Sequence, residues 1–158
     1  MHSSTHSPRG PRVPRGPHST HTPRGPRANI DPIRNAAAAI ALVSTVIAQP
    51  LRYETVGFLL DANGFGDVVV VVDGTEPADS IISVAQCLAE AGAGTPHLTS
   101  LVLATVRPCG GLRDDDVDRW LEASDVVDEC GLHLIEWYVV DPDGIQCPRD
   151  LLGEPERW

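Results

Sequence analysis

Few residues in this chain are spaced for metal binding or for proton exchange near neutral pH. Of six histidines, four lie within the first 27 residues, which leaves His97 and His133 for the rest of the chain. The four cysteines are 22, 21 and 17 residues apart, so none belongs to the close Cys-x-x-Cys pairs typical of zinc sites. Lysine is absent, which excludes a Schiff-base lysine and a lysine-containing phosphate loop.

Two segments nevertheless combine side chains that are capable of chemistry. Residues 105–110 are Thr-Val-Arg-Pro-Cys-Gly, and four aspartates follow within the next eight residues. Glu54 begins a separate apolar segment. These groups could form an internal ion pair, or a hydrolytic site with Cys109 as nucleophile or ligand and Glu54 or Asp116 as base. Consecutive acids at the start of a helix are also ordinary solvated caps.

Charge is divided unevenly along the sequence. Residues 1–27 contain five arginines and no acid, whereas the remainder has seven arginines against 22 acidic residues, a net charge of -15.

Repeated Pro, Gly, Arg and His with almost no apolar residue predict a disordered tail over 1–28, either an anion-binding arm or a dispensable extension. Residues 29–158 suit a single domain. Its acidity argues against nucleic acid as a partner. We expect an unidentified protein partner.

Apolar periodicity and turn residues define the elements that position these groups. They predict a helix over 34–49, strands over 54–61 and 66–73, a helix over 78–91, a strand over 100–106, a helix over 114–130, and strands over 132–140 and 145–147. Asn63-Gly64 indicates a hairpin between the first two strands. Five consecutive valines in the second strand predict that both of its faces are covered. The order of elements predicts an α/β fold with a mixed β-sheet flanked by helices.

Three of these segments resemble the JAB domain, also called MPN or JAMM, and within it the RadC type. Residues 53–61, Tyr-Glu-Thr-Val-Gly-Phe-Leu-Leu-Asp, resemble that family's first core strand. Residues 101–110 occupy the place of its strand leading into a His-x-His-Pro-Ser-Gly loop, and residues 131–140 resemble its late strand. The resemblance covers roughly residues 35–150 and implies a JAB/MPN-like, cytidine-deaminase-like three-layer core.

Active members of that family hold zinc through the two loop histidines and a downstream aspartate, and the first-strand glutamate acts as general base. The resemblance puts Thr105 and Arg107 in the histidine places and Asp116 or Asp118 in the aspartate place. Glu54 matches the base to within one residue. A guanidinium cannot lose its proton, and it places a positive charge where the cation sits. We therefore expect no metal cofactor, and an internal salt bridge between Arg107 and the carboxylates.

These observations predict a RadC-like JAB domain with a degenerate metal site, catalytically inactive, that acts as a protein-binding or regulatory module. The alternative is a hydrolase of isopeptidase or peptidase type with a rebuilt site of Cys109, which replaces the family's serine, Glu54 and Asp116. A DNA-repair role rests on the RadC resemblance alone, and the acidic body argues against direct DNA contact. The uncharged stretch 36–48 is too short to span a bilayer, so we expect no membrane association. The acidic, apparently leaderless sequence favours a reducing cytoplasm without disulfides.

Overall fold

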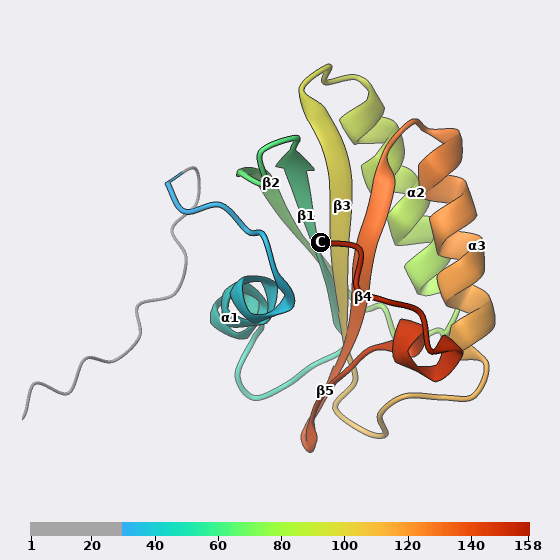
Figure 1. The fold of residues 1–158 in the computed structure, drawn as a ribbon. Coiled ribbons are helices and arrows are strands. Elements are labelled where there is room, and N and C mark those ends of the chain that lie inside the picture. The colour runs from blue at the N-terminus through green and yellow to red at the C-terminus, as the bar shows by residue number, and fades with distance from the viewer. Residues whose placement is uncertain (1–29) are drawn as a thin grey trace, which may run out of the picture.

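A five-stranded mixed sheet with helices on both faces forms the fold (Figure 1). The computed structural model describes residues 30–158, so the tail predicted for residues 1–28 lies outside the described residues. The elements are α1 (Ala36–Val46), β1 (Glu54–Asp61), β2 (Gly66–Asp73), α2 (Ser80–Ala93), β3 (Leu98–Val106), α3 (Asp116–Glu129), β4 (His133–Asp141), β5 (Gly144–Gln146) and a 3-10 turn, η1 (Pro148–Leu152). The α/β class with a mixed sheet, predicted from the sequence, is confirmed.

The strand order is β2-β1-β3-β4-β5. β1 pairs antiparallel with both β2 and β3, β3 and β4 are parallel, and β5 returns antiparallel to β4. Parallel neighbours need a crossover connection, which α3 supplies between β3 and β4. The β1–β2 hairpin closes where predicted: the Asp61 carboxylate accepts the N–H groups of Asn63 and Phe65, and Gly64 has φ +81°. The Phe65 N–H in particular holds the pKa of Asp61 below its ordinary value.

The alternation of side chains along the strands divides the core into two layers. Leu101 and Leu103 of β3 face α2 and α3, where Trp120 and Trp137 are completely buried. The intervening residues of β3 face α1. Within β1 and β3, the parity of a residue therefore assigns its side chain to one face or the other, whereas a register shift interrupts this alternation in β4. This assignment decides the composition of the candidate site.

The expectation that both faces of the second strand are covered is wrong. β2 is the outermost strand of the sheet and pairs with β1 alone. Val68, Val69 and Val71 are 36%, 41% and 42% exposed, whereas the remaining two valines of the run are partly buried. A run of β-branched apolar residues is typical of buried strands, but it does not distinguish a central strand from an apolar edge strand.

The first helix is shorter than predicted. Asn35 caps it by accepting the Ala38 N–H at 2.8 Å, and the helix ends at Val46 rather than extending to Gln49. Past the helix end, the Ala48 N–H donates to the carboxylate of Glu54 at 2.6 Å. The acid at the start of β1 therefore binds the chain that leaves α1.

Candidate functional site

A buried ion pair joins the end of β3 to the start of α3. Arg107 directly follows β3, and Asp116 is the first residue of α3. The two guanidinium nitrogens Nη1 and Nη2 donate to the two Asp116 carboxylate oxygens at 2.6 and 2.8 Å. The Arg107 and Asp116 side chains are 4% and 0% exposed. This bidentate geometry is the strongest form of an arginine–carboxylate contact.

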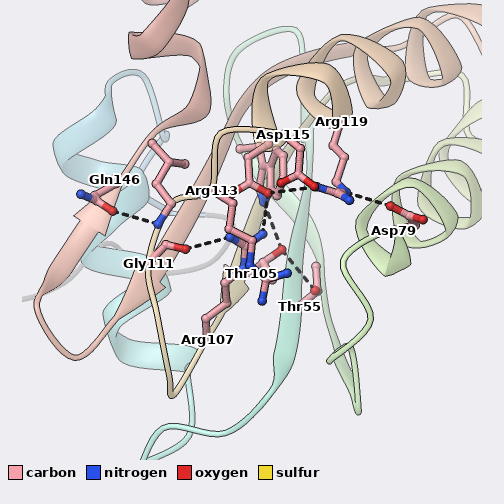
Figure 2. A network of polar contacts seen from close by, with 12 residues as sticks. Thr55, Asp79, Thr105, Arg107, Gly111, Arg113, Asp115, Arg119 and Gln146 are labelled. Atoms are coloured by element: carbon pink, nitrogen blue, oxygen red, sulfur yellow. Dashed lines mark hydrogen bonds and ion pairs between the residues drawn. The ribbon is translucent and has the colours of Figure 1, made fainter.

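Several further contacts fix the pair in place (Figure 2). Arg107 Nη1 also donates to the Gly111 carbonyl at 2.9 Å, and the Arg113 N–H donates to Asp116 at 2.7 Å. A Cβ on Gly111 would lie 2.1 Å from a carboxylate oxygen of Asp141, so a larger residue here would require the Asp141 side chain to shift. The loop between β3 and α3 is thus folded around the guanidinium of Arg107.

Thr105, which the resemblance aligns with the other histidine, also forms hydrogen bonds inside the protein. The Thr105 hydroxyl accepts the indole N–H of Trp137 at 3.0 Å and lies 3.4 Å from the Thr55 hydroxyl. Thr55 donates in turn to Thr75 at 3.0 Å. Because these groups are buried, their polar atoms need partners inside the protein, and this chain of hydroxyls supplies them.

Glu54 lies on the opposite face of the sheet, so the expectation that it faces Arg107 is not met. In the β1–β3 register Glu54 pairs with Val106, whereas Thr55 pairs with Thr105. Thr55, not Glu54, therefore shares the sheet face of Thr105. The Glu54 carboxylate instead accepts hydrogen bonds from the Ala48 N–H at 2.6 Å and from Arg52 at 3.0 Å.

The two remaining sequence-predicted residues are exposed. Asp118 lies in the first turn of α3, and its side chain makes no hydrogen bond or ion pair with residues 30–158. Of the two candidates for the family aspartate, Asp116 is therefore the one that joins Arg107. Cys109 is an exposed free thiol, and it too has no polar partner within the part of the chain that is described.

A second cluster, in which the largely buried Arg119 contacts two exposed aspartates, links the starts of α2 and α3 (Figure 2). Arg119 donates to Asp79 at 2.8 Å and pairs with Asp115 at 2.8 Å. The hydrogen bond from Arg119 holds the pKa of Asp115 below its ordinary value. Of the four aspartates at positions 114, 115, 116 and 118, one thus forms a buried ion pair, one forms an ion pair at the surface, and the remaining two are exposed.

Zinc does not fit this arrangement of donors. Both oxygens of Asp116 are engaged by Arg107, and neither a threonine hydroxyl nor a guanidinium replaces an imidazole as ligand. Within residues 30–158, no group of three or more histidine, cysteine, aspartate or glutamate side chains gathers in a geometry that could hold a metal ion. The positive charge beside Asp116 in this loop is therefore the guanidinium of Arg107.

Comparison with protein-family models, with curated proteins and with solved structures gives no match to this chain. The functional conclusion therefore depends on the sequence and on the geometry just described. No helix within residues 30–158 combines the length and apolar character needed to cross a membrane.

One buried ion pair was not predicted from the sequence. Arg149 of η1 donates to Glu136 of β4 at 2.8 Å, and the two side chains are 4% and 1% exposed. A cavity of about 130 Å³ lies beside them and is lined in part by Tyr138 and Cys147. Burial raises the pKa of the Cys147 thiol well above its ordinary value. The available signal was the single carboxylate within the otherwise apolar strand 134–140.

Proposed function

We propose that this chain is a RadC-like JAB domain whose metal site has been replaced by an internal ion pair, and that it acts as a protein-binding or regulatory module without catalysis. The proposal includes a JAB/MPN-like three-layer core formed as one domain by residues 29–158. The observation that carries it is the bidentate contact between Arg107 and Asp116, at the two positions that match zinc ligands in the resemblance.

The chemistry of the replacement supports the loss of catalysis. A zinc hydrolase needs a metal with an open coordination position and a carboxylate that accepts a proton from the bound water. On the sheet face of Arg107, Thr55 occupies the register position opposite Thr105, and a threonine hydroxyl is no base at neutral pH. Under this proposal, the positions of the ligands and of the base are thus held by residues that can perform neither role.

The geometry favours this function over a hydrolase built from Cys109, Glu54 and Asp116. Asp116 is saturated by Arg107, and Glu54 lies on the α1 face, bonded to Ala48 and Arg52. The Arg107 guanidinium, two residues from Cys109 in the sequence, is buried and directed at Asp116, so it does not activate the thiol. The hydrolase would need all of these groups at one reaction centre.

Calorimetric titration of zinc into the full chain tests the proposal. We expect no stoichiometric binding to the wild type. The matched variant Thr105→His/Arg107→His restores two imidazoles and frees Asp116, so we expect it to bind one zinc per chain with an affinity at least tenfold higher than any residual wild-type binding. Stoichiometric binding by the wild type would overturn the proposal. Failure of the folded double variant to bind zinc would mean that this loop does not correspond to the family's ligand loop.

A further inference from the structure

The cavity beside the Glu136–Arg149 ion pair has a buried hydroxyl in its wall that lacks a partner. The cavity measures about 130 Å³, and Ala36 and Ile40 of α1 line its apolar side. Tyr138 of β4 also lines it and is 3% exposed, yet the Tyr138 hydroxyl makes no hydrogen bond of ordinary length with residues 30–158. Buried hydroxyl groups almost always have a partner, so an unpartnered one at a cavity indicates a missing ligand or water.

The buried carboxylate of Glu136 provides a second acceptor in the same wall. Glu136 and Tyr138 are two residues apart on β4, so their side chains lie on the same face of the sheet. The Glu136 Oε2 atom accepts the Arg149 Nε–H at 2.8 Å, whereas Oε1 accepts the N–H of the adjacent Trp137 at the longer distance of 3.3 Å. An ionised carboxylate has about four acceptor positions, so Glu136 can accept a further donor from the cavity.

The side chains around the cavity have a net negative charge. They include one guanidinium, of Arg149, against three carboxylates, of the buried Glu136 and the exposed Asp150 and Glu156, which gives a formal charge of -2. The guanidinium is already engaged by Glu136, by Asp150 at 3.0 Å and by the Glu154 carbonyl. The cavity should therefore repel anions and attract cations.

The two weakly acidic side chains of the wall respond to the same surroundings. Burial, and after it the Glu136 carboxylate, raises the pKa of the Tyr138 hydroxyl and the pKa of the Cys147 thiol well above their ordinary values. The indole N–H of Trp158 opposes this rise in Tyr138, but it forms no hydrogen bond of ordinary length within residues 30–158. At neutral pH the Tyr138 oxygen thus belongs to an uncharged hydroxyl, which can accept a hydrogen bond from a ligand.

We propose that this cavity binds a small organic cation whose head is a guanidinium or a primary ammonium group. The N–H groups of the cation donate to Glu136 Oε1 and to the Tyr138 hydroxyl, and the edge carboxylates of Asp150 and Glu156 attract it. The volume of about 130 Å³ equals that of about four water molecules, which suits a head group of about five non-hydrogen atoms. An organic cation is favoured over a metal ion, because the acidic groups within residues 30–158 are not gathered in a geometry that could hold a metal. The proposal does not depend on the loop around Arg107.

Titration of methylguanidinium into the ¹⁵N-labelled full chain, followed by nuclear magnetic resonance, tests the site. We expect saturable shifts at the backbone amides of Glu136, Tyr138 and Cys147, with a dissociation constant of about 1–10 mM, as suits so small a ligand. Methylurea has nearly the same shape without the charge, and we expect it to bind at least about tenfold more weakly. Equal binding of the two probes would show that the cavity does not select a cation, and would overturn the proposal.

Three variants locate the binding. Tyr138→Phe removes the hydroxyl but keeps the ring, and should weaken methylguanidinium binding at least about fivefold. Glu156→Gln removes one edge charge and should weaken it at least about twofold. The control is Glu122→Gln, which removes an exposed carboxylate of α3 far along the chain and should leave the affinity unchanged. Wild-type affinity in the folded Tyr138→Phe and Glu156→Gln variants would place the binding elsewhere on the acidic surface and refute the assignment.

An arginine of this chain is one source of such a head group, and a free amine or guanidine compound is the other. The sequence Pro-Arg-Gly-Pro occurs three times before the described residues, at 8–11, 14–17 and 23–26. The arm that distinguishes the sources replaces five arginines by glutamine: Arg9, Arg12, Arg15, Arg24 and Arg27. If one of them occupies the cavity, the variant should bind methylguanidinium at least about threefold more tightly than wild type, because the competitor is gone. Unchanged affinity identifies a free cation as the ligand, and absence of binding to both proteins would overturn the proposal.

Discussion

Removal of the Arg107 guanidinium should destabilise the fold strongly. Arg107→Met retains a long apolar side chain but leaves Asp116, which is 0% exposed, without the two hydrogen bonds at 2.6 and 2.8 Å. Asp116 keeps the Arg113 N–H at 2.7 Å, and Arg119 approaches only to 3.7 Å. Breaking a buried pair from one side typically costs about 3–5 kcal/mol. That is a large fraction of the roughly 5–15 kcal/mol that stabilises an ordinary domain.

A double variant separates the cost of leaving the Asp116 carboxylate without a partner from the cost of losing the packing of Arg107. Arg107→Met/Asp116→Leu removes both charges together, and apolar replacement of a buried pair is often neutral. We therefore expect the double variant to be at least about 2 kcal/mol more stable than Arg107→Met alone. The assay is urea unfolding followed by the fluorescence of the buried Trp120 and Trp137.

An exposed member of the neighbouring arginine cluster provides the control. The Asp79 side chain is 79% exposed in its pair with Arg119, so Asp79→Asn should cost less than about 1 kcal/mol. If Arg107→Met costs no more than Asp79→Asn, the ion pair does not organise the loop and the reasoning is wrong. A double variant as unstable as Arg107→Met would show that lost packing, rather than the uncompensated carboxylate, causes the effect.

Two further predictions concern the surroundings of this loop and the second buried polar cluster. Gly111→Ala should lower the free energy of unfolding in urea by about 1–3 kcal/mol, because the added Cβ would lie 2.1 Å from the Asp141 carboxylate unless that side chain shifts. The control is Gly94→Ala, whose Cβ would have its nearest contact at 3.6 Å and should change the free energy little. Equal effects of the two substitutions would contradict the close approach at Gly111. The raised pKa of Cys147 means that the unfolded chain loses this proton first, so the stability it contributes is complete below about pH 8 and falls as pH rises above the ordinary thiol value. Between pH 8 and 10 the wild type should lose up to about 1.4 kcal/mol per pH unit more than Cys147→Ala, measured by urea midpoints, and parallel pH profiles would refute this.

The sequence predicts the elements of this fold well where local chemistry decides them. Asn63-Gly64 predicts the hairpin because a tight turn needs a residue that tolerates positive φ, and Gly64 has φ +81°. The resemblance predicts a salt bridge between Arg107 and the carboxylates of Glu54 and of Asp116 or Asp118. Only the pair with Asp116 forms, across the single loop that joins β3 to α3.

The errors arise where the answer depends on tertiary context. The one-residue uncertainty at Glu54 changes its sheet face, since side chains alternate strictly along a strand. The valines of β2 look like a buried strand because composition does not reveal which strand ends the sheet. The Glu136–Arg149 pair joins residues 13 positions apart, and Arg149 lies in a short 3-10 turn. No local sequence pattern predicts that contact.

We propose that Arg107 occupies the position that a zinc ion takes in the JAB family, and the zinc content of the purified protein decides between the two. The full chain, purified without chelators from cells grown with added zinc, is analysed by inductively coupled plasma mass spectrometry beside Thr105→His/Arg107→His. We predict far less than one zinc per wild-type chain and close to one per chain of the variant. One zinc per wild-type chain, retained through dialysis, would mean that Arg107 does not replace the metal.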